Sequence, residues 1–525
     1  MWHADIVAAA GFLSRLPRFL RRPLSVAAAE AEVAARLARR GDDFLAGLRT
    51  RVFAFPRSPY HALFGAAGCA YDDAARLVQR DGLEAALRAL ARAGIYLTVD
   101  ELKGRTPAVR GSARIAVDPG ALRNSAARGP LAGQTSGSGG ARTAVPIDLG
   151  YVRDCAADSA VMLAARGGAA WDKGHWAPLG GGALMSLLQF SAFGAPSVRW
   201  FSQVDPGDAA LHPRYRWSAR CAVAVSRLAG RPLPAPRFAP LDAPLPVVEW
   251  LRESLRAGRT PHLLTYPSSA ARLGDTACAR GIDLAGAQIT VSGEPVTEAR
   301  LAALRRAGAV VVPRYGTAET GPIGLGCLAA GAPDEVHLLT DLHAVVQLPA
   351  GEGPALPPGA LFLTSLRPTS PFVLLNVSLG DEAVLDARRC GCALEGRGWT
   401  THLHRIRSFE KLTVAGMTLL DMDVLPLLDT LLPARFGGSG LDYQLVEHEA
   451  VDGAPRLQLV VDPAVGPLDE AALVEVLLAA IEAQSPAGRV AARLFRQAGV
   501  LQVLRQPPGR SASGKVLHLL RRPRP

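Results

Sequence analysis

Lysine is scarce in this 525-residue sequence, which has only four lysines although lysine and arginine together number 58. The four are Lys103, Lys173, Lys411 and Lys515. This bias indicates a compositional pressure that replaces lysine by arginine wherever a generic positive charge suffices, although the two side chains differ in shape and hydration. Each remaining lysine is therefore a candidate for a specific role.

Cysteine and long apolar runs are also sparse. Seven cysteines, an odd number, are spread through a long chain, which does not match a disulfide framework and favours the reducing cytoplasm. Residues 8–20 are apolar, but Arg15 and Arg18 interrupt them and no basic segment precedes them. We therefore predict neither a signal peptide nor a membrane span. A surface-seeking amphipathic helix is the alternative for this segment.

Acidic residues are too few to balance the basic ones, and the net charge is +11 with a pI near 9.7. The basic residues are scattered and gather only at the two ends of the chain, so a solvated basic surface explains them and we expect no nucleic-acid partner. An apolar fraction of 49% and a mean hydropathy of +0.15 exclude a disordered chain. The length exceeds that of one hydrophobic core, which predicts at least two domains.

The hydrophobic periodicity predicts an α/β protein. Helices are predicted at residues 24–49 and 72–93, and after Gly120 helix-like stretches alternate with short apolar runs, as in a sheet covered by helices. A different pattern begins near residue 407, where a helix is predicted to start after the N-cap Asp469. We therefore predict a large N-terminal domain, residues 1–406, whose first 120 residues are helical, and a small mobile C-terminal α+β domain, residues 407–525. The other predicted elements are strands at 310–313, 360–366, 372–377 and 456–461 and a helix at 421–432.

A polar loop follows the first helices. Residues 134–140, Gln-Thr-Ser-Gly-Ser-Gly-Gly, combine hydroxyls with glycines that let the backbone approach an anion closely, a composition that suits phosphate. The Gly-Lys-Ser/Thr of a Walker loop is missing. Taken alone, a flexible linker is an equally good interpretation.

A second motif follows the strand predicted at 310–313. It reads Tyr315-Gly-Thr-Ala-Glu319 and combines an aromatic ring with a carboxylate. Such groups at the end of a strand can stack on a base and hold Mg²⁺, which prefers oxygen ligands alongside phosphates. The competing interpretation is an ordinary turn with Glu319 at a helix start.

The order of these motifs along the chain is more specific than any one of them. The Ser/Gly loop is followed by Gly293-Glu294, Tyr315-Gly-x-x-Glu319, Gly380-Asp381, an arginine-rich junction and a terminal Ser-Gly-Lys515. This series resembles the adenylate-forming superfamily of acyl-CoA synthetases, adenylation domains and luciferases, and most of all its phenylacetate-CoA ligase branch. The resemblance spans residues 133–516.

The resemblance implies a role for each matching residue. Thr135, Ser136, Gly137, Ser138 and Gly139 would bind the β- and γ-phosphates of ATP, and Glu319 would hold Mg²⁺. Asp381 would bind the ribose hydroxyls, Arg407 or Arg405 would be the hinge-side arginine, and Lys515 would be the catalytic lysine. The nucleotide-binding set is completed by Gly293, Glu294, Tyr315, Gly316 and Thr317, with Tyr315 stacked on adenine.

The sequence departs from the family pattern at four places. These departures are compatible with adenylation, but they leave open the second half-reaction and the identity of its acceptor. The departures are Ala318 for the usual threonine (Thr317 is the alternative hydroxyl), Arg142-Thr143 after the loop, Asn376-Val377 before Gly-Asp, and Phe409 for the hinge acid, with Glu410 next to it.

Two further segments have competing interpretations. Cys390-Gly-Cys392 with His402 and His404 would supply half of a zinc site, but the C-x-C spacing is tight and favours ordinary turn residues. Residues 176–193 fall where the superfamily builds its acyl pocket, and a plain helical core segment is the alternative.

The resemblance therefore predicts an AMP-forming acid–thiol ligase. It would use ATP and Mg²⁺ to activate a small carboxylic acid, aromatic or otherwise apolar, as acyl-AMP, and then transfer it to coenzyme A or the phosphopantetheine arm of a carrier protein. Two alternatives remain: transfer to a protein cysteine, an amine or another nucleophile, and a non-catalytic basic binding protein on the same fold.

Overall fold

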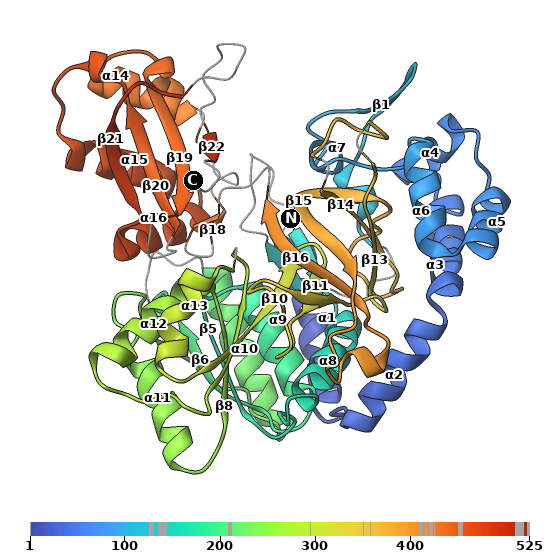
Figure 1. Ribbon diagram of the computed structural model, residues 1–525, viewed down its shortest axis with the longest axis horizontal. Helices are drawn as coiled ribbons and strands as arrows, with labels where there is room; N and C mark the ends of the chain where they lie inside the picture. Colours follow the sequence, from blue (N-terminus) through green and yellow to red (C-terminus); the bar gives the residue numbers. More distant parts are fainter. Residues whose placement is uncertain are drawn as a thin grey trace.

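A twelve-stranded sheet runs through the centre of the protein (Figure 1). The computed structural model describes residues 2–124, 131–134, 144–207, 213–294, 296–349, 351–357, 359–408, 413–414, 417–418, 424, 426–449, 455–509 and 519–521. One half of the sheet is antiparallel and the other is parallel, and β10 belongs to both. In spatial order the strands are β13 (His343–Val346), β14 (Ala360–Ser365), β15 (Val377–Ala387), β16 (Thr401–Ser408), β12 (Val336–Leu338), β11 (Gly321–Leu325), β10 (Val310–Thr317), β9 (Gln288–Ser292), β8 (Pro261–Thr265), β5 (Asp172–Ala177), β6 (Ser197–Ser202) and β7 (Pro236–Phe238).

Helices connect the parallel strands and cover the sheet, as the α/β prediction requires. All five residues of β8 are buried, because a parallel strand with helices on both faces meets no solvent. The helices of this part are α8 (Leu149–Ala164), α9 (Gly181–Ser191), α10 (Pro213–Leu228), α11 (Leu245–Arg256), α12 (Pro267–Ala279) and α13 (Glu298–Arg306).

The first 102 residues are mainly helical and form part of the main body. The helices predicted at 24–49 and 72–93 are each broken in two: Arg39 leaves helical geometry after α2, and Gly82 has a φ of +83° after α5. Phe12 and Leu16 of α1 are fully buried, so its apolar face belongs to the core. Among the described residues no helix combines the length and apolar character of a membrane span. These helices are α1 (Trp2–Leu20), α2 (Val26–Ala38), α3 (Arg40–Leu48), α4 (Pro59–Ala66), α5 (Tyr71–Asp81), α6 (Leu83–Arg92) and α7 (Val99–Leu102).

The C-terminal part has its own four-stranded sheet, which Figure 1 shows to one side of the large sheet. The predicted N-cap is confirmed, because the Asp469 side chain accepts a hydrogen bond from Ala472 N at 3.0 Å. Arg272 Nη2 donates to Ala498 O at 2.7 Å and links this part to α12. The strands in order are β21 (Leu501–Arg505), β20 (Pro455–Val461), β19 (Tyr443–Glu449) and β22 (Leu519–Arg521), and the helices are α14 (Leu432–Phe436), α15 (Glu470–Gln484) and α16 (Pro486–Ala498).

Two predicted elements differ in the structure. Residues 372–376 form no strand, because Asn376 has a φ of +48° and β15 begins only at Val377. The described part of the helix predicted at 421–432 is a π-helical turn, Leu427–Leu431, that runs into α14. The predicted fold class is confirmed: helices cover a large sheet, and a small sheet domain follows it. The domain boundary at 406/407 remains a prediction.

Candidate active site

The hairpin of β10 and β11 lies where the sheet changes from parallel to antiparallel. Val312 and Pro313 of β10 are buried between β9 and β11, which is why an apolar run precedes the motif. A side chain at Gly316 would place its Cβ 2.4 Å from Gly321 O, so only glycine fits this close approach. The hairpin therefore presents Tyr315, Gly316, Thr317 and Glu319 at the carboxyl end of a parallel strand, the usual position of ligand sites in α/β sheets.

Tyr315 and Asp381, two of the residues predicted to bind nucleotide, are in direct contact. Tyr315 Oη donates a hydrogen bond to Asp381 Oδ2 at 2.8 Å, across 66 positions of sequence. Burial raises the pKa of Tyr315 well above its ordinary value, and the neighbouring Asp381 carboxylate adds to the rise. Both residues line a small cavity whose other walls are aliphatic, including Ile323 and Leu379. The phenol therefore stays neutral and donates its proton to the carboxylate.

Arg407 lies beside this pair, on β16. Asp381 is the strand partner of Ser408, and Glu382 is the strand partner of Arg407. Arg407 Nη1 donates to Asp334 Oδ2 at 3.0 Å.

Asp334 fixes the backbone that carries Arg407. Its carboxylate also accepts the backbone N–H groups of Arg405 at 3.1 Å and Ile406 at 2.7 Å. Arg405 has a φ of +55°, a conformation that non-glycine residues seldom adopt without compensation. Sequence reasoning missed Asp334, because nothing local distinguishes it from an ordinary loop acid.

Glu319 occupies the turn between β10 and β11. Its side chain is partly exposed and borders a cavity whose walls include Lys103, Leu122 and Phe372. The neighbouring Thr317 and Thr320 hydroxyls are 3.0 Å apart. Residues 318–320 form the turn between the antiparallel strands β10 and β11, so the alternative of a helix start at Glu319 is wrong.

Gly293 and Glu294 follow β9, whose Ser292 is the strand partner of Arg314. Gly293 has a φ of +85°, and a Cβ there would lie 2.8 Å from the Tyr266 ring. The Glu294 carboxylate is buried and accepts hydrogen bonds from Ser268 N at 2.9 Å and Ser268 Oγ at 2.8 Å. Glu294 therefore caps the N-terminus of α12, and both of its carboxylate oxygens accept hydrogen bonds from Ser268 in doing so.

Two of the predicted site segments lie outside the described residues. They are the Ser/Gly loop with Thr135, Ser136, Gly137, Ser138 and Gly139, and the C-terminal motif with Lys515. The strands that flank the loop, β3 (Leu131–Gln134) and β4 (Ala144–Ile147), pair as an antiparallel hairpin.

Residues 176–193 divide between core and site. The Trp176 indole is fully buried and donates to Ala239 O at 2.8 Å, and Phe190 and Phe193 pack edge to face. These aromatic side chains serve the core, as the helical-core alternative predicts. On the same stretch Gln189 Oε1 accepts from Arg314 Nη2 at 3.3 Å, and Met185 lies next to Gly321, so one face of α9 contacts the β10–β11 hairpin.

Neither protein-family models nor curated protein sequences give a match to the chain. Solved structures do. 2-Hydroxyisobutyryl-CoA ligase, in complex with 2-HIB-AMP and CoA, is 17% identical and has a TM-score of 0.52, with 94% of this chain and 90% of that chain covered.

Two other structures are similar at lower scores. A double mutant of o-succinylbenzoate CoA synthetase from Bacillus subtilis gives 16% identity and a TM-score of 0.41, covering 74% of this chain and 68% of that chain. A point mutant of an amide bond synthetase from Marinactinospora thermotolerans gives 16% identity and a TM-score of 0.39, covering 87% of this chain and 91% of that chain. On the strength of the first match, which spans both sheets, the chain has the fold of the adenylate-forming ligases.

Proposed function

We propose that the protein activates a carboxylic acid with ATP, forming an acyl-AMP anhydride and pyrophosphate, and then transfers the acyl group to a thiol with release of AMP. The observation that carries this proposal is the 2.8 Å hydrogen bond between Tyr315 and Asp381. It unites two motifs that the sequence assigns to the same nucleotide, at the carboxyl end of β10 in a ligase fold.

The residues around this pair suit an adenosine. The Asp381 carboxylate would accept the ribose hydroxyls, and the Tyr315 hydrogen bond orients it for that task. The ring of Tyr315 would stack on adenine. The Arg407 guanidinium, held by Asp334, would face the nucleotide from the neighbouring strand.

Glu319 is the residue that would hold Mg²⁺. Its partial exposure in a turn next to two threonine hydroxyls fits a cation that keeps water and phosphate ligands and takes only one or two carboxylates from the protein. The metal would neutralise phosphate charge, while the chain's own task is to position the carboxylate of the acid in line with the α-phosphate. We assign Lys515 to that carboxylate and to the α-phosphate, and residues 135–139 to the outer phosphates, on the sequence pattern alone.

The acid is proposed to bind between α9 and the β10–β11 hairpin. Met185 makes this face apolar, which suits an aromatic or aliphatic acid, whereas Gln189 and Arg314 add a polar pair. The substrate panel should therefore contain plain aromatic acids and hydroxy acids. Coenzyme A or a carrier-protein arm is the proposed acceptor, reached when the C-terminal domain, residues 407–525, rotates about the junction near Arg407.

A reducing compartment, the cytoplasm, is proposed for the protein. None of the seven cysteines forms a disulfide in the structure, which supports a reducing compartment.

Isotope exchange between pyrophosphate and ATP tests adenylation directly, with each acid of the panel in turn. The expected result is acid-dependent exchange that Glu319→Gln abolishes and Glu298→Gln leaves intact, since Glu298 is an exposed acid paired with Arg305. Exchange with no acid of a broad panel would favour the non-catalytic binding protein. Adding coenzyme A, a carrier protein or an amine to preformed acyl-AMP then identifies the acceptor.

A further inference from the structure

A cluster of three cysteines and one histidine lies away from the nucleotide site, on the connections of the antiparallel half of the sheet. The ligand atoms of Cys327, His337, Cys390 and Cys392 all lie within 4.8 Å of one another. Cys327 follows β11 and His337 is the central residue of β12. Cys390 and Cys392 are in the loop between β15 and β16. We propose that these four residues bind a zinc ion that ties this loop to β11 and β12.

The distances agree with tetrahedral zinc. With Zn–N near 2.05 Å and Zn–S near 2.3 Å, two ligands at the tetrahedral angle have N and S about 3.6 Å apart. His337 Nε2 lies 3.3 Å from Cys392 Sγ and 3.6 Å from Cys390 Sγ. The cluster therefore needs only small adjustments to enclose the ion.

The histidine is held in the state that a metal ligand requires. His337 Nδ1 lies 2.6 Å from Trp399 O, so Nδ1 carries the proton and donates it to the carbonyl. The other nitrogen, Nε2, then has a free electron pair directed at the sulfurs. A hydrogen bond from the non-ligating ring nitrogen to a carbonyl is the typical support of a zinc-bound histidine.

The backbone around the cysteines is shaped to bring both sulfurs to one side. Gly391, between them, has a φ of +74°, although a Cβ there would meet no atom within 4 Å. Glycine is thus needed for the conformation of the turn. Gly391 N also donates to Glu395 Oε2 at 2.7 Å, which fixes the turn from outside.

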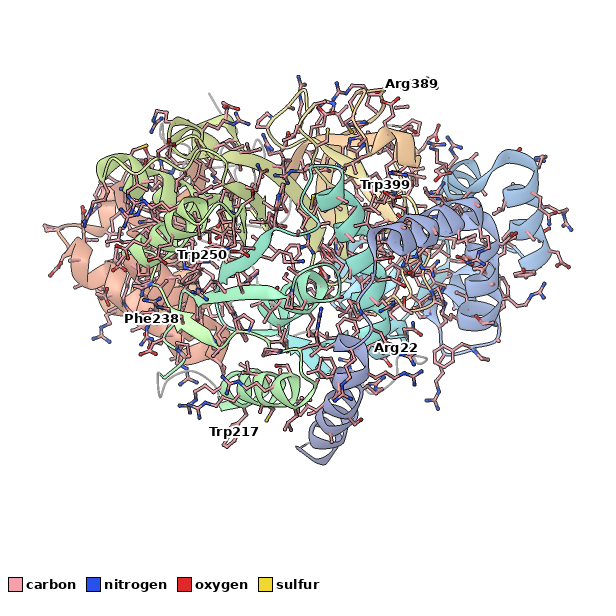
Figure 2. The ribbon with its side chains drawn as sticks, turned by 90° about the horizontal axis from the view of Figure 1, so that it is seen from below. Arg22, Trp217, Phe238, Trp250, Arg389 and Trp399 are labelled. Atoms are coloured by element: carbon pink, nitrogen blue, oxygen red, sulfur yellow. The ribbon has the colours of Figure 1, made fainter. Side chains whose placement is uncertain are left out.

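Burial and charge complete the site. His337 and Trp399 are fully buried and Cys327 is 8% exposed. Figure 2 shows Arg389, the residue before Cys390, at the edge of the molecule. Three thiolates, a neutral histidine and zinc would together carry one net negative charge. Four protein ligands leave no open position, so the zinc is structural.

The histidines that the sequence suggested are not in the cluster. His402 is the strand partner of His337, and the two ring centroids are 4.1 Å apart, but His402 Nδ1 faces Glu335 Oε1 at 2.7 Å. His404 lies further along β16, opposite Val384. The sequence favoured turn residues because the C-x-C spacing is tight. It gave no sign that His337 and Cys327, more than 50 positions away, would lie next to Cys390 and Cys392.

Metal analysis of the full-length protein tests the proposal. Protein purified with zinc in the medium and dialysed against metal-free buffer is expected to retain about one zinc per chain. The double variant Cys390→Ser/Cys392→Ser should retain at least about tenfold less. Cys278→Ser is the matched control, because that cysteine is exposed and outside the cluster, and it should retain as much zinc as the parent.

Cobalt provides a readout that does not depend on the variants folding. Parent protein stripped of metal and titrated with Co²⁺ should develop thiolate-to-cobalt absorption and the strong visible bands of a tetrahedral site, and zinc should abolish them. Absence of both retained zinc and these bands overturns the proposal, as does a disulfide between Cys390 and Cys392 in freshly purified protein. Equal zinc in the double variant and the parent also overturns it.

Discussion

Replacing Arg36 by methionine should destabilise the protein through a buried charge network. Arg36 is on α2 and only 1% exposed. Its guanidinium lies 3.0 Å from Asp154 and 3.3 Å from Asp341, and 3.7 Å from Asp158. The network joins the N-terminal helices to α8 and to the loop after β12, so it tests whether the first 120 residues are part of the main fold.

The magnitude follows from what the substitution leaves behind. Arg36→Met fills similar space but leaves the buried Asp341 without a cation and Asp154 with Arg367 alone, at 3.4 Å. Such a loss of a buried charge partner costs about 3–5 kcal/mol. For a folding unit of about 400 residues, with an unfolding entropy of about 2.1 cal/mol/K per residue, we expect the melting temperature to fall by roughly 4–6 °C. Trp399 Nε1 donates to Asp341 Oδ1 at 3.0 Å, so Trp399, one of seven tryptophans, contributes to the fluorescence change by which urea unfolding is followed.

Arg397→Met is the matched control. Arg397 pairs with Glu30, which is also on α2, but the arginine side chain is 47% exposed, so its loss should cost less than about 1 kcal/mol. Adding Asp341→Asn to Arg36→Met should recover part of the stability, since Asp341 is the carboxylate that the first substitution leaves without a cation. Equal effects of Arg36→Met and Arg397→Met would refute the reasoning.

Three further predictions concern pH, the nucleotide and the lysine. Burial, together with Asp341, holds the pKa of Asp158 well above its ordinary value, so the folded state keeps a proton that the unfolded chain loses above about pH 4. The contribution of Asp158 to stability should therefore fall from about pH 4 upward, so the melting temperature of Asp158→Asn should rise relative to wild type over the same window. A difference that stays constant with pH contradicts this. Tyr315→Phe keeps the ring but loses the hydrogen bond to the carboxylate, and should raise the KM for ATP roughly 5- to 10-fold. Tyr443→Phe, which loses a bond to Gly437 O in the C-terminal domain, should leave that KM unchanged, and a similar rise in both would contradict the assignment. Lys515→Ala should lower acyl-AMP formation by about 10²–10³ and spare thiolysis of supplied acyl-AMP, while Arg522→Ala should change little; equal losses in the two variants would remove Lys515 from the mechanism.

Much of the fold was predictable where the signal was local. The N-cap at Asp469, the apolar run of β10 and the strand β20 depend on neighbouring residues only, and the structure confirms them. Breaks were harder to predict. Gly82 and Asn376 interrupt a helix and a strand through a positive φ, and the apolar periodicity on either side conceals such a break.

The sequence by itself determined the class of the fold and the residues assigned to the nucleotide, because ordered motifs and hydrophobic periodicity are local in the chain. The tertiary structure alone decided which distant residues meet. Tyr315 reaches Asp381, Asp334 supports Arg407, and His337 joins Cys390 only because the strand order β15-β16-β12-β11-β10 makes neighbours of segments far apart in sequence. That order is settled by packing of the whole sheet, which no local pattern encodes.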